Sequence, residues 1–493
     1  MLFNSTEFLI FFPIVLIIYF IVPRKVRYIW LLIASYYFYM SLNPQYLILL
    51  IVLTLLTYFT GIFMEKGTPK AKKCCMVVCL IVSLGILCVF KYSGFVIDSI
   101  NDILTGLHMQ PVAAVFNPIL PVGISFYTFQ AVGYMLDVYR GNGKAERNIA
   151  KYALFVSFFP NILSGPIERG KNILPQIDGL KDQKLWNYDR ITSGAVLMLW
   201  GYFQKMVIAD RVALLVNEVY DNYRIHGAVA IIVATLFFSV QVYCDFASYS
   251  NMAIGAARIM GIDLMRNFET PYFAKSVGEF WRRWHISLST WFKDYLYIPL
   301  GGNRCSKIRH YFNLMVVFLV SGLWHGASWG YVVWGALHGA YQVIGIQTKA
   351  LRNRIAEKLQ FKTESFSYKL MQVGMTFSMV GFAWIFFRAE DVGQAGGMIS
   401  RLFTRWDPWT LFDESVYTWG LERKEFWIAV FAVMVLLVVD LVRRIKKQDI
   451  IQMLNTQCIW FRWGLYLLLL FAVVILGYYG PTYDPQAFLY FAF

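Results

Sequence analysis

Residues 314–339 read LMVVFLVSGLWHGASWGYVVWGALHG and place two histidines, His325 and His338, within otherwise apolar sequence. An ionisable side chain at membrane depth is costly and usually faces protein or a water-filled path. If the segments are helical, His325 lies about 24 Å from Arg309, at about 1.5 Å per residue. By the same rise, His338 lies about 16 Å from Lys349. A bilayer core is about 30 Å thick, so neither imidazole is expected at the headgroups.

Small residues surround the first of these histidines, and they predict either a close helix–helix contact or a break in the helix. They are Ser321, Gly322, Gly326, Ala327, Ser328 and Gly330. We expect 311–326 and 329–347 to form a helical hairpin that ends inside the membrane.

The composition is that of an integral membrane protein. Of the 493 residues, 58% are hydrophobic and only 15% are charged, and the mean hydropathy is +0.51. So few charges cannot solvate a globular surface of this size. The net charge of +15 raises the question of a nucleic-acid partner. The basic residues lie in loops between apolar runs, so we attribute them to the positive-inside bias and expect no nucleic acid.

Apolar length predicts an all-α integral membrane protein with about 11–12 transmembrane helices, plus re-entrant and interfacial helices. Basic loops follow the first, third and fifth spans, which predicts an external N-terminus and a multi-pass protein of the cell membrane. The candidate spans are 6–23, 28–43, 45–63, 74–95, 117–138, 192–214, 228–247, 311–326, 329–347, 367–388, 426–443 and 460–480.

Three stretches are too polar or too irregular to be ordinary spans. Residues 152–169 contain FFPNILSGP, whose prolines predict a broken or re-entrant helix. Residues 243–253 place Asp245 beside the end of a span. Residues 266–310 form a long cytoplasmic loop in which aromatic and basic residues alternate, as in a helix that lies in the interface plane.

Three histidines are candidates for catalysis: His285, His325 and His338. Burial without a carboxylate lowers the pKa of an imidazole, and a neutral imidazole can accept a proton from a hydroxyl as a general base. The chain contains no HExxH, Walker A or GxGxxG motif. We expect no metal, because no two histidines have the i,i+4 spacing.

Several motifs, taken together and in order, resemble the signature of the membrane-bound O-acyltransferases. The likeness covers most of residues 1–390 and favours the alginate O-acetyltransferase-like bacterial branch of that family. The matching blocks are WHG at 324–326 with WGALHG at 334–339, the run EFWRRWHISLSTW at 279–291 with YIPLGGNR at 297–304, PVGISFY at 121–127, DVYR at 137–140, GP at 165–166 and DFASYSNMAIG at 245–255.

The resemblance implies a ring of tilted helices around a thin central tunnel, with funnels from both faces of the membrane. We expect a single polytopic domain over 1–493. Its core would be 1–390, including a cytoplasmic interfacial segment at 266–310, and 391–493 would add a loop and two further spans that match more loosely.

The resemblance also implies roles for individual residues. His325 is expected to be the catalytic residue, His285 the second polar catalytic residue of the tunnel, and His338 a lining or supporting residue. Other candidates for tunnel or supporting positions are Asp245, Trp324, Ser321, Asn161 and Ser164. For Asp245 we considered orientation of an imidazole or capping of the next helix, and turn chemistry explains Asn161 and Ser164 equally well.

Three basic residues of the interfacial segment, Arg282, Arg283 and Lys293, could bind the phosphates of coenzyme A. Anchoring of an interfacial helix to the membrane explains them equally well. No cofactor is expected to be resident, since acetyl-CoA or another acyl thioester would be the donor substrate.

The favoured hypothesis is an O-acetyltransferase that moves acetyl groups from a cytoplasmic thioester for modification of a cell-envelope or extracellular polysaccharide. The resemblance suggests a partner, an extracytoplasmic SGNH/esterase-like acetyltransferase, that finishes the transfer. One alternative is transfer of D-alanine from a carrier protein to teichoic acid. Another is a transporter or flippase with a histidine proton relay, although the chain has no internal repeat.

Overall fold

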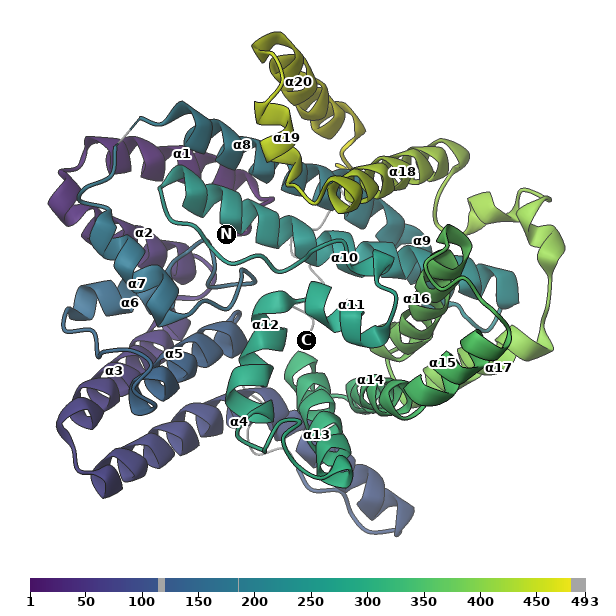
Figure 1. The fold of residues 1–493 in the computed structure, drawn as a ribbon, viewed down its shortest axis with the longest axis horizontal. Coiled ribbons are helices and arrows are strands. Elements are labelled where there is room, and N and C mark those ends of the chain that lie inside the picture. The colour runs from purple at the N-terminus through teal and green to yellow at the C-terminus, as the bar shows by residue number, and fades with distance from the viewer. Residues whose placement is uncertain (114–119, 185, 480–493) are drawn as a thin grey trace. The chain divides into compact units, whose positions relative to one another are not determined.

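A computed structural model describes residues 1–113, 120–184 and 186–479. Over these residues the regular structure is helical throughout, without a β-strand (Figure 1), and this confirms the predicted all-α fold class. Residues 117–119 of one predicted span and residue 480 of another lie outside the described residues. The described chain forms two compact units, and each is considered by itself.

The first unit comprises Met1–Met198 and Met252–Met265. Polar residues begin several of its helices: the Asn43 side chain accepts a hydrogen bond from the N–H of Gln45, and Thr68 caps the following helix in the same way. Its helices are α1 (Thr6–Ile21), η1 (Arg24–Val26), α2 (Arg27–Met40), α3 (Pro44–Lys66), α4 (Pro69–Gly106), α5 (Ile124–Tyr139), α6 (Ile149–Ser157), α7 (Gly170–Gly179) and most of α8 (Tyr188–Tyr202).

The second unit comprises Leu199–Asn251 and the described residues from Arg266 onward. Helix α10 (Ala228–Ile259) begins in this unit, and its residues from Met252 belong to the first. The other elements are η2 (Phe203–Ala209), α9 (Asp210–Asp221), η3 (Pro271–Phe273), α11 (Val277–Arg283), α12 (Ile286–Phe292), η4 (Lys293–Tyr297), α13 (Lys307–His325), α14 (Trp329–Gln347), α15 (Lys349–Lys358), α16 (Phe366–Arg388), α17 (Val392–Thr404), η5 (Pro408–Leu411), η6 (Ser415–Thr418), α18 (Arg423–Lys446), α19 (Ile450–Asn455) and α20 (Ile459–Leu476).

Six of the described helices are long and apolar enough to cross a membrane, namely α3, α4, α10, α16, α18 and α20. Each of the other predicted spans also falls on helical structure that is shorter or less apolar. The predicted span 192–214 is not a single α-helix. It contains the end of α8, the π-helical turn η2 and the start of α9, which follow one another without a gap.

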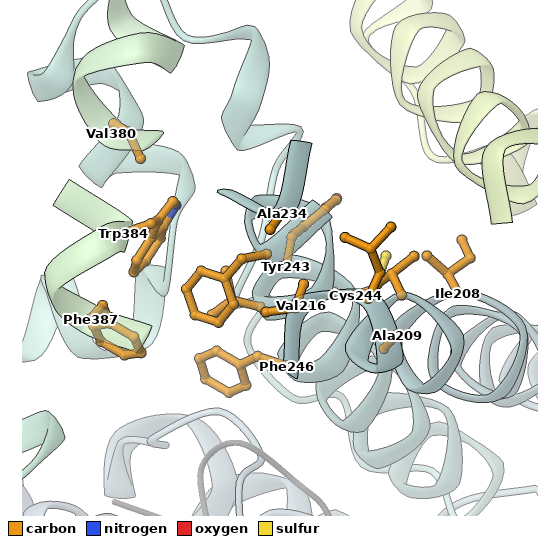
Figure 2. Packing of buried hydrophobic residues seen from close by; sticks show 14 of the residues in the cluster. Ile208, Ala209, Val216, Ala234, Tyr243, Cys244, Phe246, Val380, Trp384 and Phe387 are labelled. Atoms are coloured by element: carbon orange, nitrogen blue, oxygen red, sulfur yellow. The ribbon is translucent and has the colours of Figure 1, made fainter. Parts of the chain in front are cut away.

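An aromatic core fills the second unit. Figure 2 shows Trp384 and Phe387 pointing from α16 toward α10, which carries Tyr243 and Phe246. On α16 the spacing from Val380 to Trp384 to Phe387 puts all three on one helical face. That face is buried, with Trp384 only 1% exposed.

Glycines allow α13 and α14 to pack closely as a hairpin. A Cβ atom on Gly322 would lie 2.2 Å from the backbone oxygen of Tyr331, and one on Gly335 would lie 2.4 Å from that of Phe318. Such distances are far inside van der Waals contact. The predicted close approach of the two helices around His325 is therefore confirmed.

Two details of the sequence interpretation are wrong. The segment from Glu279 to Tyr295 is not one interfacial helix, because α11 and α12 have seven residues each and a left-handed residue separates them. Its tryptophans are buried rather than spread over a membrane surface. Asp245 does not stand at the end of a span and does not cap a helix, because it lies in the interior of α10.

The break predicted within 152–169 is present. Helix α6 ends at Ser157, and α7 does not begin until Gly170. The residues between them are buried, and backbone contacts explain the small residues there. A Cβ on Gly165 would lie 2.4 Å from the Cα of Asn161.

Candidate active site

His285 separates α11 from α12 and has φ 45° and ψ 54°, the left-handed conformation. This conformation is uncommon for a residue with a Cβ atom and marks a position that the surrounding structure enforces. The N–H of Ile286 donates to the carbonyl of Asn267 at 2.9 Å, which helps to hold the break in place. The imidazole of His285 is fully buried, and its burial lowers its pKa well below the ordinary value.

His325 is the last residue of α13 and is 3% exposed. Its ring lies edge-to-face with Trp334 at 5.1 Å between centroids and with Phe387 at 5.5 Å. The ring of His285 lies 6.2 Å away, also centroid to centroid. The short segment between α11 and α12 thus brings His285 close to His325, although the two are 40 positions apart in the sequence.

Aromatic rings enclose this histidine pair. Phe246 of α10 lies edge-to-face with His285 at 4.5 Å between centroids. Trp324 contacts both imidazoles, at 5.7 Å from His285 and 5.1 Å from His325. The predicted supporting residue Ser321 is buried one turn before His325 on the same face of α13.

His338 of α14 is fully buried, and its ring packs against Trp334, which also contacts His325. The rings of Trp334 and His338 lie 4.9 Å apart, edge to face. The indole N–H of Trp281 donates to Nδ1 of His338 at 3.1 Å. An indole nitrogen can only donate, so this contact requires an unprotonated Nδ1 and places the proton of a neutral ring on Nε2. His338 therefore packs against the site as a neutral ring.

Asp245 forms part of a buried ion cluster in the second unit. Lys205, in the π-helical turn η2, places its Nζ atom 2.6 Å from Oδ1 of Asp245 and 2.8 Å from Oδ1 of Asp210. The lysine side chain is 2% exposed. Phe246, the neighbour of Asp245, contacts His285, so the cluster fixes the part of α10 that lines the site. Orientation of an imidazole by Asp245 stays a prediction.

Asn161 and Ser164 belong to the first unit, and both are buried. The amide of Asn161 donates to Oε1 of Gln130 at 2.9 Å, and the N–H of Glu168 donates to the same oxygen at 3.2 Å. Gln130 also donates to the carbonyl of Phe155. These bonds organise the non-helical stretch after α6, and a role of Asn161 or Ser164 in the tunnel stays a prediction.

The three predicted donor-binding residues differ in their surroundings. Arg282 and Lys293 are exposed. Arg283 is partly buried, and its Nη2 atom lies 2.8 Å from Oε1 of Glu279. It also donates to Oγ1 of Thr270 at 3.1 Å. Arg283 is thus held within the fold, whereas the other two extend from it.

The sequence interpretation missed several residues of the site. Lys205 is one of two cations in the predicted span 192–214, together with Arg211, and it lies five residues before Asp210; a charge at such a position was a usable signal. Phe246 and Trp334 lie in the matched blocks 245–255 and 334–339 but were given no role in the site, and Phe387 gave no signal, because aromatic residues are common throughout the chain. Only the fold brings these three to the histidines.

The arrangement suits proton transfer in a dry environment. Two buried imidazoles lie with their ring centres 6.2 Å apart among aromatic rings. Removal of water from such a site strengthens every electrostatic interaction at the reacting atoms. A neutral imidazole so placed can take a proton from a hydroxyl and return it to a leaving group. This is the chemistry of acyl transfer from a thioester to an alcohol.

Comparisons with known proteins point to the same chemistry. A model of MBOAT, the membrane-bound O-acyltransferase family, matches residues 145–388. The probable alginate O-acetylase of Pseudomonas syringae pv. tomato is 37% identical over 414 residues, which are 83% of this chain and 76% of the relative. The peptidoglycan O-acetyltransferase of Helicobacter pylori is 34% identical over 426 residues, 80% of this chain and 78% of the relative. The teichoic acid D-alanyltransferase of Bacillus subtilis is 29% identical over 270 residues, 50% and 66% of the two chains.

The fold, the histidine pair and these relatives define a multi-pass acyltransferase of the bacterial plasma membrane. The chain belongs to the membrane-bound O-acyltransferase family. The predicted family, enzyme class and membrane O-acetyltransferase function are confirmed, and the likeness to the O-acetylating relatives covers more of the chain than the likeness to the D-alanyltransferase. An enzyme is thereby favoured over a transporter or flippase.

Proposed function

We propose that this protein transfers an acetyl group from a cytoplasmic thioester, acetyl-CoA, to a hydroxyl on the pathway to a cell-envelope or extracellular polysaccharide. The observation that carries the proposal is the pair of buried imidazoles of His285 and His325, whose rings lie 6.2 Å apart inside an aromatic enclosure. The names of the relatives with the greater coverage, an alginate O-acetylase and a peptidoglycan O-acetyltransferase, support the acetyl group and a glycan acceptor.

In the proposed reaction His325 is the general base. Its imidazole takes the proton of the acceptor hydroxyl as the oxygen attacks the thioester carbonyl. The new ester C–O bond forms and the C–S bond breaks, and the imidazolium returns its proton to the leaving thiolate. The products are an O-acetyl ester and a free thiol. General-base help of this kind contributes about 10²–10⁴-fold to the rate.

His285 would position the thioester beside His325. The left-handed backbone at His285 turns its ring into the enclosure, where it contacts Phe246 and Trp324. Both imidazoles are buried, so the acyl group and the hydroxyl must reach them through the interior of the protein. Orientation of the two reactants there would add to the general-base contribution.

A partner on the outer face would complete the reaction sequence. The chain provides a membrane enzyme, while a glycan outside the cell needs an acceptor step on the external side. An extracytoplasmic SGNH/esterase-like acetyltransferase is the partner that we propose. The second candidate is D-alanyl transfer to teichoic acid, for which the observation is the 29% identity to a D-alanyltransferase over half of this chain.

The test uses purified protein in detergent with radiolabelled acetyl-CoA, and it follows both acetyl transfer to small alcohols and hydrolysis. His325→Ala should lower kcat by about 10²–10⁴-fold, because the general base is lost. His310→Ala is the matched control, because it makes the same change on the same helix, α13, away from the site. His285→Ala should raise the KM for the donor.

Two results would contradict this assignment. A folded His325→Ala protein with full acetyl transfer would remove the proposed general base. Loss of activity in His285→Ala with unchanged donor binding would remove the donor-positioning role. Transfer of D-alanine from a charged carrier protein, with no reaction of acetyl-CoA, would favour the second candidate.

A further inference from the structure

Two arginines of the second unit share a single carboxylate. Oε1 of Glu279 lies 2.8 Å from Nη2 of Arg283 and 3.9 Å from Nη2 of Arg444. One carboxylate cannot neutralise two guanidinium groups, and Arg282 beside them on α11 is exposed and adds a third positive charge. The cluster therefore carries an excess of positive charge and attracts anions.

The guanidinium of Arg444 is held in place but has hydrogen-bonding capacity left. Arg444 lies in the last turn of α18, and its Cζ atom lies 6.0 Å from the centre of the Phe273 ring. Its Nη1 atom is buried and has no hydrogen-bond partner within the described parts of the chain. The side chain as a whole is 22% exposed, as is that of Arg283. A planar guanidinium with free donors and some access to solvent is suited to bind a phosphate.

The end of α18 is fixed to the core that carries the histidines. Asp440 of α18 accepts a hydrogen bond from the hydroxyl of Tyr243 at 2.9 Å and pairs with Arg443 at 3.3 Å. The ring of Tyr243 packs against Trp284, the residue before His285, at 6.2 Å between centroids. Arg444 and His285 are therefore anchored to the same packed structure.

The cluster lies on the side of the membrane where the donor is expected. The sequence RRIKK at 443–447 ends α18, and the positive-inside rule predicts that this end faces the cytoplasm. A cytoplasmic acyl thioester carries its acyl group on pantetheine, and that arm bears a phosphate both in coenzyme A and on a carrier protein. A fixed anion site on the cytoplasmic side would bind this shared feature.

We propose that Arg283 and Arg444 bind the phosphate of the pantetheine arm of the acyl donor, and that Glu279 is a resident counter-ion which this phosphate displaces. The proposal rests on the proposed function, because it assigns part of the donor site. It adds the C-terminal end of α18, which lies beyond the family match at 145–388, to the binding of the donor.

The proposal predicts opposite effects for the two members of one ion pair. Arg444→Gln should weaken the binding of coenzyme A and of 4′-phosphopantetheine about tenfold, the effect of one charge-assisted hydrogen bond. Glu279→Gln should tighten the binding of both several-fold, because the competing charge is gone. The glutamine oxygen can still accept the N–H of Lys275, as Glu279 does at 2.8 Å. Pantetheine, which has no phosphate, should bind all variants equally.

The experiment measures calorimetric binding of these three probes to the full-length protein in a neutral detergent, with thermal unfolding to confirm folding. Arg423→Gln is the matched control. It removes one positive charge at the other end of the same helix, where Arg423 pairs with Glu414. It should bind all probes as the unmodified protein does.

Three outcomes would overturn the proposal. Parallel weakening by Arg444→Gln and Glu279→Gln would mean that the ion pairs only tether α18. Weaker binding of coenzyme A with unchanged binding of phosphopantetheine would assign the arginines to the nucleotide phosphates. Unchanged binding of every probe, with weaker binding of the Arg444→Gln protein to anionic vesicles, would assign them to lipid headgroups.

The failure of this inference is distinguishable from the failure of the proposed function. If the probes respond as expected but no acetyl group is transferred, the phosphate site stands and the reaction must be reassigned. If acetyl transfer depends on His325 but Arg444→Gln leaves both the binding of the probes and the KM for acetyl-CoA unchanged, the reaction stands and this site does not.

Discussion

The indole of Trp281 and the imidazole of His338 form a hydrogen bond in which Nε1–H donates to Nδ1 at 3.1 Å. The bond joins α11 to α14 inside the aromatic core, and it fixes which nitrogen of His338 carries the proton. Such a bond is consistent with the predicted supporting role of His338, which stays a prediction. The acceptor nitrogen of His338 is already in use, and its ring packs against Trp334, as the ring of His325 does.

Trp281→Phe should therefore lower stability more than it lowers the rate. The change keeps an aromatic ring but removes the donor. It costs about 1 kcal/mol for the lost hydrogen bond, and it also leaves the buried Nδ1 atom of His338 without a donor. We expect a lower unfolding temperature and a kcat within about tenfold of the unmodified protein. A stable Trp281→Phe protein that is as inactive as His325→Ala would place His338 in the reaction itself.

The stability of the protein should fall as the pH is lowered through the weakly acidic range. Burial lowers the pKa of His285 in the folded state, whereas the unfolded chain has the ordinary value of about 6.5. The unfolded state then binds the proton more readily, so the stability contributed by this group is present above pH 6.5 and is lost as the pH falls toward the folded-state pKa. Between pH 7.5 and 5.5 the loss is about 1 kcal/mol for one such group.

Thermal unfolding at these two pH values checks this expectation. His285→Gln should show a smaller difference between pH 7.5 and 5.5 than the unmodified protein does. His108→Asn is a suitable control, because His108 is exposed and asparagine tolerates its left-handed backbone. An unchanged difference in His285→Gln would mean that this imidazole does not resist protonation in the folded protein.

The hairpin of α13 and α14 should tolerate no side chain at its contact. Gly322→Ala would place a Cβ 2.2 Å from the backbone oxygen of Tyr331. The helices must separate to relieve this clash, which costs about 1–3 kcal/mol and displaces His325, three residues further on. We expect reduced stability and reduced acetyl transfer together. Gly345→Ala, on α14 with open space around it, should instead be neutral or slightly stabilising.

Much of the fold was predictable from local sequence. The apolar length of each segment gave the helices, and the small residues beside His325 gave the tight hairpin, because both signals depend on chemistry within one or two turns. The break in 152–169 was predictable from Pro160 and Pro166 for the same reason. These features can be predicted without knowing which residues pack against them.

The parts that were mispredicted depend on packing across the fold. The alternation of aromatic and basic residues in 279–295 is compatible with an interfacial helix, but Trp284 packs against Trp384 of α16, with ring centroids 5.2 Å apart, and is buried. Nothing local shows that partner. Asp245 looked like a cap because the apolar run stops there, yet α10 continues because Lys205 compensates the charge.

In the cluster of Lys205 with Asp210 and Asp245, removal of the lysine should destabilise the protein far more than removal of the charge of Asp245. Lys205→Met would leave two buried carboxylates without their shared cation, and removal of one partner from a buried pair costs about 3–5 kcal/mol. We expect little folded protein in the membrane for this variant, measured as the monodisperse fraction after detergent extraction.

Asp245→Asn should be much milder, because Lys205 keeps its ion pair with Asp210 at 2.8 Å and the asparagine oxygen can still accept a hydrogen bond from Nζ. The double variant Lys205→Met, Asp245→Asn should recover part of the folded fraction, since it removes one of the two carboxylates that Lys205→Met leaves without its cation. The rate separates the two roles of Asp245. If the carboxylate only holds α10 and Phe246 in place, Asp245→Asn should keep kcat near that of the unmodified protein. A stable Asp245→Asn protein with a kcat at least 100-fold lower, on the order of a lost orienting group, would show that the carboxylate acts on an imidazole.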